Sequence, residues 1–200
     1  MIKTISFLSV VLAMLYIPNS IADDKTKKSP EEMMSDYMLL AQPGTQHQLL
    51  ENMTGKWNQE IKLWTQPDQA EPAIFKGTSN NKLILGGRFL QIESKGGVGD
   101  WYTESLTFLG FDRRHQKYTT VSMDTWGTYY VTAKGEYSEA TKTITMYGED
   151  YDPVMDITQR YNMIYRFPNP NQYISEVVFK DFRSKGKDFK MVEIVHTKSK

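Results

Sequence analysis

The sequence predicts an all-β fold, an antiparallel meander β-barrel of about ten strands with a short N-terminal helix before it. From residue 55 onward, short runs rich in Thr, Tyr, Val, Ile, Phe and Trp alternate with Gly, Pro, Asn and Asp clusters. The runs follow one another through short connections, which favours sequential hairpins. Ten such strands would leave two long unpaired edges, and closing the sheet into a barrel removes both.

Composition limits the chain to one ordinary domain. It has 200 residues, 24 Lys plus Arg, 24 Asp plus Glu and no cysteine. A net charge of +0 provides no overall field that would attract nucleic acid, so we expect no nucleic-acid partner. Hydrophobic residues make up 40% of the chain, which is enough for a packed core that holds without disulfides.

The first 22 residues have the pattern of a secretory signal peptide. Lys3 supplies a positive charge, an apolar run covers residues 5–17, and Ser20 and Ala22 are small residues at the positions before a cleavage site between Ala22 and Asp23. The apolar run is shorter than the roughly 20 residues that span a bilayer. No cysteine follows that could carry a lipid anchor. We therefore expect a secreted, periplasmic protein of bacterial type, without stable membrane insertion after signal removal.

Residues 23–29 are polar and lysine-rich, and are predicted to form a flexible tether. Residues 30–53 form the predicted helical segment. Ser29 is a capping residue, Pro30 suits the first helical position, and a second helical turn is expected within residues 45–53. The first helix carries a methionine-rich stripe, which we interpret as core packing, with an adaptable binding surface as the alternative.

Residues 54–200 form the predicted barrel domain. Alternation is clearest where Tyr161, Met163 and Tyr165 share one face of a strand. Elsewhere polar and apolar residues share a strand face: Ser122 and Asp124 lie on the same face as Trp126. A barrel that encloses a partly polar cavity tolerates such mixing. The predicted strands cover residues 55–65, 74–84, 87–95, 101–111, 116–125, 128–137, 142–149, 156–167, 172–183 and 187–197.

Several short motifs resemble a known family. A Gly-x-Trp sequence that includes Trp57 opens the first strand and resembles the start of lipocalins and their calycin relatives. Further segments, in this order, are similar to the bacterial family known as domain of unknown function 1579: residues 77–78, 85–90, 109–112, 124–128, 135–137 and 152–153. The resemblance covers about residues 47–197. It implies a lipocalin-like barrel and leaves the activity unassigned.

A neighbouring calycin-type branch, the nitrobindins, binds haem through a histidine near the end of its last strand, where His196 stands in this sequence. The glycine-rich, aromatic opening of that branch is absent here. We therefore interpret His196 as an ordinary histidine and predict no cofactor. The alternation around it does not decide which way it faces, because both faces of that strand are apolar.

The sequence contains no recognisable catalytic or metal motif. His47, His115 and His196 are scattered, which does not match a zinc site with local ligand spacing. Acidic residues gather around Pro153 without the glycine and final glutamate of a calcium loop, so we interpret them as solvated loop carboxylates. Whether the protein is an enzyme is left open, with a non-catalytic role favoured.

Candidate ligand-binding residues remain. Arg88 would need a carboxylate partner if buried, such as Asp124, Glu149 or Glu176, and the pair could anchor an acidic head group. The alternative is a purely structural bridge. The predicted function is binding of a small hydrophobic or amphiphilic ligand, with a structural or protein-interaction barrel as the alternative and an enzyme as a third. The full candidate set is Trp57, Arg88, Asp124, Trp126, Tyr161, Met163 and Tyr165.

Overall fold

The computed structural model describes residues 28–182 and 186–200. The predicted signal peptide, its cleavage site at Ala22 and Asp23, and most of the predicted tether lie outside these residues. Contacts divide the chain into two units, residues 1–37 and 38–200, and each is described by itself. The helix α1, Pro30–Leu40, contains the boundary between them.

Helix α1 begins where the sequence predicts. The Glu32 backbone N–H donates to Ser29 Oγ at 3.2 Å, and the Ser29 N–H donates to the Glu32 carboxylate at 2.7 Å, so the two residues form a capping box. The interpretation of the methionine stripe as core packing is wrong, because α1 has no buried residue and Met34 is 54% exposed. No helix in the described part of the chain is long and apolar enough to cross a membrane.

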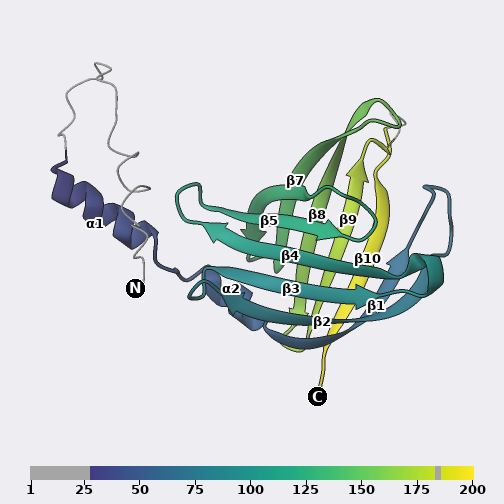
Figure 1. Ribbon diagram of the computed structural model, residues 1–200, viewed down its shortest axis with the longest axis horizontal. Helices are drawn as coiled ribbons and strands as arrows, with labels where there is room; N and C mark the ends of the chain where they lie inside the picture. Colours follow the sequence, from purple (N-terminus) through teal and green to yellow (C-terminus); the bar gives the residue numbers. More distant parts are fainter. Residues whose placement is uncertain (1–27, 183–185) are drawn as a thin grey trace, which may run out of the picture. The chain divides into compact units, whose positions relative to one another are not determined.

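Ten antiparallel strands form one closed barrel, which confirms the predicted fold class (Figure 1). Each strand pairs with its neighbours in sequence, and β1 pairs with β10 to close the ring. The strand ends lie within three residues of the predicted ones. The strands are β1 Gly55–Leu63, β2 Ala73–Ile84, β3 Phe89–Gly96, β4 Thr103–Asp112, β5 Lys117–Asp124, β6 Val131–Ser138, β7 Thr143–Asp152, β8 Ile157–Asn169, β9 Gln172–Lys180 and β10 Phe189–Lys198.

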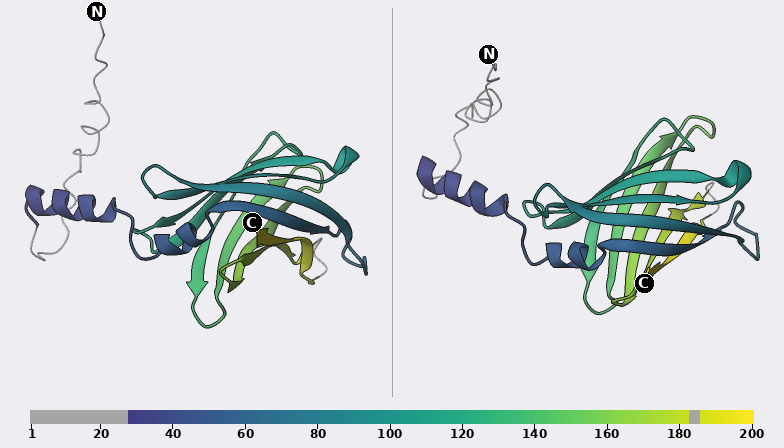
Figure 2. Two further views of the ribbon diagram at one scale, coloured as in Figure 1. Left: turned by 90° about the horizontal axis from the view of Figure 1, so that it is seen from below. Right: turned by 60° about the horizontal axis from the view of Figure 1, so that its bottom comes forward.

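The barrel is flattened into two walls whose strands cross. Strands β2 to β5 run across the direction of β7 to β9, and the crossing is visible from two directions (Figure 2). Because side chains alternate along a strand, every second residue of each wall points into the barrel. The register fixes which residues these are, since direct cross-strand neighbours share a face.

A bulge in β10 explains why the alternation there was ambiguous. The pairing with β9 shifts between Lys190 and Val192, so the inward phase changes within the strand. Phe189 faces inward before the bulge, opposite Phe179. After the bulge the even-numbered residues face inward, and His196 lies opposite Tyr173.

A short helix seals one end of the barrel. Helix α2, His47–Asn52, places Leu50 and then Met53 in the barrel end, where they are 0% and 1% exposed. The Trp57 indole N–H and the Asn81 amide both donate to the Met53 carbonyl, at 3.0 and 2.9 Å. The Tyr118 hydroxyl donates to the Gln46 carbonyl at 3.0 Å, which ties the other end of α2 to β5.

The densest core lies against this helix. Large side chains from both walls meet there with almost no exposure, and this packing anchors α2 and the ends of the strands. The fully buried ones are Leu50, Met53, Trp57, Leu90, Leu109, Ile144, Met146 and Tyr173.

Candidate functional site

The end of the barrel opposite α2 is its mouth, and it is rich in exposed aromatic residues. The hairpins β1–β2, β3–β4, β5–β6, β7–β8 and β9–β10 all turn at this end. Trp101, on the β3–β4 connection, stacks on Phe75 with ring centroids 6.3 Å apart, and meets Trp126 edge-on at 5.8 Å. Trp101 and Trp126 are nevertheless 45% and 50% exposed, so the cluster borders on solvent.

The β3–β4 hairpin holds Trp101 through a glycine. Gly97 has a φ of +90°, and a Cβ at this position would lie 2.0 Å from the Trp101 carbonyl oxygen. Only glycine fits such a close approach in this backbone conformation. The local sequence therefore fixes the path of the loop that carries the tryptophan.

Inward residues in the middle of the barrel are less buried than those at the α2 end. Thr107, Ser122, Met163, Ser175 and Val177 face inward by register, and all retain intermediate exposure. At the α2 end, inward residues of the same strands are buried, such as Leu109 at 0% exposure and Tyr173 at 1%. Burial of the inward side chains therefore increases from the middle of the barrel towards α2.

One interior wall carries a row of hydroxyl groups. Ser79, Ser94 and Ser105 are direct cross-strand neighbours on β2, β3 and β4. In the adjacent inward row, the hydroxyl oxygens of Thr107 and Ser122 lie 2.7 Å apart across β4 and β5. The hydroxyls of two further inward threonines, Thr103 and Thr120, are buried without a hydrogen-bond partner among the described residues.

A buried histidine extends the polar wall across the barrel seam. His196 is 3% exposed, and its ring stacks on Tyr173 with centroids 3.9 Å apart. Gln59 Nε2 lies 3.3 Å from His196 Nδ1 and also donates to Ser94 Oγ at 3.1 Å. Ser175 Oγ lies 2.9 Å from His196 Nε2.

These contacts fix the direction of the hydrogen bonds. Burial lowers the pKa of His196 to about 3, so its ring is neutral at pH 7. Because an amide nitrogen only donates, His196 Nδ1 accepts from Gln59, and the N–H at Nε2 donates to Ser175. The hydroxyl protons of Ser94 and Ser175 are therefore available to donate to another group.

The histidines differ in their surroundings, and the pKa of His196 does not suit a general base at neutral pH. A general base is most effective when its pKa lies near the working pH, and a histidine with a pKa of about 3 is far from it. His47 and His115 lie in α2 and in the β4–β5 turn, where His115 pairs with Asp112 at 2.8 Å. Within the described residues, no group of three or more His, Cys, Asp or Glu side chains could hold a metal ion.

The facing wall is apolar. Met146, Met163, Val177 and Val192 form a direct cross-strand row through β7, β8, β9 and β10. Tyr161 also faces inward, and its hydroxyl donates a hydrogen bond to the Thr132 carbonyl at 3.0 Å. In the middle of the barrel, the interior therefore presents mainly hydroxyl groups on β2 to β5 and mainly methyl and thioether groups on β7 to β10, where Ser175 adds a further hydroxyl.

The structure separates the predicted site residues. Trp57 and Tyr165 are buried towards the sealed end, whereas Tyr161 and Met163 lie further up the same inward face of β8. Asp124 and Trp126 are at the mouth, where the Trp126 N–H donates to Asp124 Oδ1 at 2.8 Å.

The expected pair of Arg88 and Asp124 does not form, because the two residues lie at opposite ends of the barrel. Arg88 is in the β2–β3 turn beside α2, and its guanidinium donates to the Ala41 and Leu85 carbonyls at 2.9 and 3.0 Å. The two other proposed partners are also elsewhere: Glu176 accepts two hydrogen bonds from Arg166, and Glu149 lies on the outer face of β7, opposite Arg160. Arg88 therefore acts as a clamp on the chain before α2.

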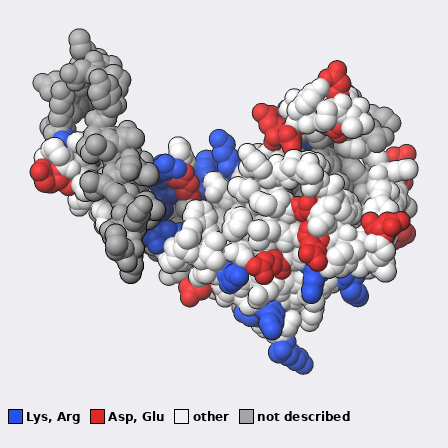
Figure 3. Space-filling view, viewed as in Figure 1, with Lys and Arg blue, Asp and Glu red and all other residues white. Residues whose placement is uncertain are grey.

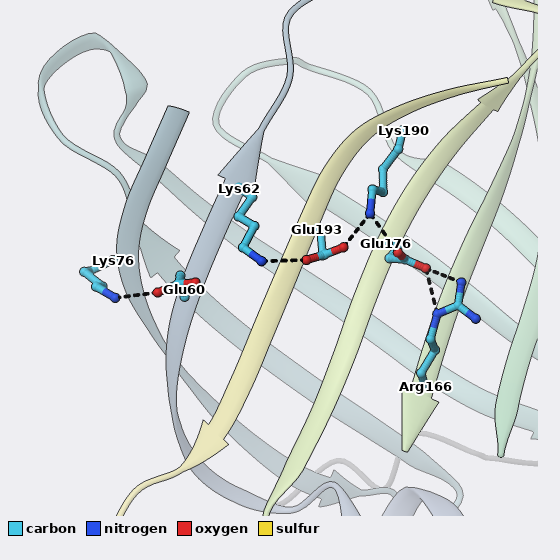
Figure 4. A network of polar contacts seen from close by, with 7 residues as sticks. All are labelled: Glu60, Lys62, Lys76, Arg166, Glu176, Lys190 and Glu193. Carbon is cyan, nitrogen blue, oxygen red and sulfur yellow. Dashed lines mark hydrogen bonds and ion pairs between the residues drawn. The ribbon is translucent and has the colours of Figure 1, made fainter. Parts of the chain in front are cut away.

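Glu176 belongs to a charged ladder on the outer face of the barrel, across β1, β10, β9 and β8 (Figure 4). Lys190 bridges Glu176 and Glu193, and Lys62 contacts Glu193 at 2.9 Å. Partial burial opposes ionisation of Glu193, but hydrogen bonds from Lys190 and Lys62 outweigh it and hold its pKa below the usual range. This ladder joins the closing strands from outside.

A shallow groove of about 850 Å³ also lies on the outside, over β1 to β5. Most of its lining side chains point outward by register, including Lys95, Glu93 and Glu104. Residues of the inward rows, among them Ser94 and Ser105, also border it. Acidic and basic side chains are interspersed over the face shown in Figure 3. The groove therefore offers mixed charges on an open surface.

Sequence reasoning did not identify Gln59, Ser94, Ser175 or the Thr107–Ser122 pair as site residues. A signal for them was present, because the hydroxyls recur at alternate positions of neighbouring strands. This signal can be recognised only when the strand register is known, because the register shows that serines of separate strands lie side by side.

Comparisons with known proteins identify a family and two similar solved structures. A family model described as "Protein of unknown function (DUF1579)" matches residues 42–198. An S-type phycobiliprotein lyase, CPES, from Guillardia theta is similar in structure, with a TM-score of 0.52 and 9% identity over 78% of this chain and 94% of that one. A structure titled EF1p2_mFAP2b bound to DFHBI matches with a TM-score of 0.39 and 7% identity, over 76% of this chain and 98% of the other. No curated protein shows significant sequence similarity to the chain.

Proposed function

The chain belongs to the DUF1579 family of proteins of unknown function, and we propose that it binds a small amphiphilic molecule inside its barrel. One observation carries this proposal: inward side chains in the middle of the barrel retain exposure, while the α2 end is sealed. Closed barrels of this strand number can leave an interior that side chains do not fill, and this chain forms such a barrel. The ligand would enter between the aromatic residues of the mouth.

The site would bind its ligand by enclosing it in the barrel and removing its apolar surface from water. Burying the apolar part of a ligand against Met163 and Val177 contributes about 25 cal/mol per Å². Trp101 and Trp126 would cover the part of the ligand nearest the mouth, since exposed aromatic rings lose solvent contact when a ligand packs on them. The similarity to a phycobiliprotein lyase, at 9% identity, supports the barrel architecture and not a shared ligand.

We also propose that the protein works outside the cytoplasm, as a periplasmic or secreted carrier or sensor. This part rests on the N-terminal sequence, with its apolar run and the small residues that end at Ala22. Fractionation of the native host, followed by N-terminal sequencing, would test it. We expect a mature chain that begins at Asp23; a full-length chain in the cytoplasmic fraction would contradict the proposal.

The binding proposal is tested with an uncharged fluorescent amphiphile, N-phenyl-1-naphthylamine, and two neighbouring substitutions. Val177→Trp fills the interior from β9, and Val178→Trp places the same side chain on the outer face of that strand. We expect saturable binding by the native chain and by Val178→Trp, and a loss of at least about tenfold in affinity for Val177→Trp.

Circular dichroism and thermal unfolding would establish that both variants fold. If Val177→Trp fails to fold, Met163→Trp fills the same space from β8. Equal affinities for the inward and outward variants, or no binding by the native chain, would overturn the proposal.

A further inference from the structure

We infer that the barrel selects an uncharged ligand whose head group carries several hydroxyl, carbonyl or ether oxygens. The inference rests on the proposed function and adds the chemical class of the ligand. It follows from the two unlike walls of the interior, the hydroxyl row of β2 to β5 and the apolar row of β7 to β10.

The hydroxyl wall supplies donors that the protein does not consume. Ser94 on β3 accepts a hydrogen bond from Gln59 and keeps a proton to donate. Ser175, which lies on β9 beside the apolar row, likewise accepts from His196 and keeps its proton. In the Thr107–Ser122 pair, one hydroxyl donates to the other, so one proton of the pair is also left. Oxygen atoms of a ligand that faces this wall would satisfy these donors.

The interior lacks a cation that could pair with an anionic ligand. Among the described residues, no inward strand position carries Lys or Arg, and the acidic inward positions lie towards the mouth, where Asp124 is the direct neighbour of Ser105. A cationic group that lies deeper than these carboxylates would also be unpaired. Burying an unpaired charge costs far more than burying a neutral polar group that is hydrogen-bonded.

Acidic residues at the mouth disfavour anions further. Asp124 and Asp150 share the inward face of β5 and β7 near the rim, and both are exposed. An anionic head group entering the barrel would pass these carboxylates and then find no cation. The acidic head group expected from Arg88 is therefore replaced by a neutral one, because Arg88 lies at the sealed end.

The distribution of polarity also sets the shape of the ligand. The serine row crosses three adjacent strands, and the apolar row faces it from the other wall. A head group with only one polar atom would leave part of the hydroxyl wall without partners, which is unfavourable in a buried site. A neutral head group with several oxygen atoms can satisfy donors on more than one strand, while its apolar part faces the other wall.

The test compares probes with the same twelve-carbon chain: 1-monolaurin, which is uncharged and carries hydroxyl and ester oxygens, dodecanoate, and dodecyltrimethylammonium. Each displaces bound N-phenyl-1-naphthylamine at pH 8, below its micelle concentration. We expect monolaurin to bind at least about tenfold more tightly than either charged probe. Equal or tighter binding of a charged probe overturns the inference, while the proposed function stands because the interior is occupied.

A paired substitution links the preference to the hydroxyl wall. Thr107→Val with Ser122→Ala removes both members of one hydrogen bond, so neither is left unsatisfied. We expect monolaurin affinity to fall about fivefold and naphthylamine affinity to change by less than about twofold. Thr119→Val, on the outer face of β5, is the control and should change neither.

Unchanged monolaurin affinity in the double variant would overturn the role of this wall. If no probe binds the native chain at all, the proposed function fails, and the inference fails with it. The two failures are thus distinguished by whether the naphthylamine probe binds.

Discussion

The two ends of the barrel are built from the same strands but in opposite ways. At the α2 end, large side chains such as Leu50 and Trp57 are almost fully buried, and the hydrogen bonds of α2 reach three strands. At the mouth, Trp101 and Trp126 are about half exposed, and the residues below them are small and hydroxylated. The difference indicates that stability is concentrated at one end, which leaves the other free to bind.

The largest expected effect is at the sealed end. Leu50→Ala removes a side chain that is 0% exposed and leaves a cavity between α2 and the strands. We expect the free energy of unfolding to fall by about 3 kcal/mol, measured by urea denaturation. A loss below about 1 kcal/mol would show that α2 is not an integral part of the core, and the contrast between the ends would disappear.

The second effect concerns pH and the buried histidine between the two ends. His196 has a pKa of about 3 in the folded chain, against roughly 6.5 when unfolded. Between these values only the unfolded chain takes up the proton, so stability decreases as pH falls. From pH 7 to pH 4.5, this group alone should cost about 2 kcal/mol.

Urea titrations at several pH values, on the native chain and on His196→Gln, separate this contribution from that of the carboxylates. The variant should lose less stability on acidification than the native chain does. Parallel pH profiles would contradict the prediction, even if the variant is less stable at pH 7.

A smaller effect is expected where α2 is tethered. Tyr118→Phe keeps the buried ring and removes only the hydroxyl that donates to the Gln46 carbonyl. We expect a loss of about 1 kcal/mol, the usual contribution of one hydrogen bond. Tyr165→Phe on β8, another buried tyrosine, is a suitable control, because burial alone raises the pKa of its hydroxyl. An equal loss there would mean that the tether is not specific.

The smallest effect is expected at the mouth. Tyr130, which is 64% exposed, can be replaced by alanine with a change in stability within about 0.5 kcal/mol. Thermal unfolding would measure it. A loss comparable to that of Leu50→Ala would show that the rim also carries the fold, and would remove the distinction between the ends.

Much of this fold was predictable because its signals are local. The capping box of Ser29 and Glu32 and the order of ten hairpin-linked strands follow from short-range patterns. The strand directions of a meander also determine which turns share an end. Arg88 follows the second strand, and Asp124 lies just before the turn after the fifth strand. In a meander these two turns are at opposite ends, so the two residues could have been assigned to opposite ends of the barrel.

The interior of the site was less predictable, because it depends on register. A bulge at Lys190 and Val192 changes the inward phase of β10, and no local pattern reveals that change. The environment of His196 depends on three strands that are distant in sequence. The methionine stripe of α1 has a helical spacing that suits a core, but spacing alone does not determine what a helix packs against.

The pairing of β1 with β10 has a consequence for how the chain acquires its structure. All other pairings join consecutive strands, whereas the contact of Gln59 with His196 spans 137 positions. Without β10, the sheet would have two unpaired edges, and Gln59 would lack its contact with His196. Closing so long a loop carries a large entropic cost, so ring closure should be the slow, late step of folding. A chain truncated before β10 should therefore aggregate through its unpaired edges.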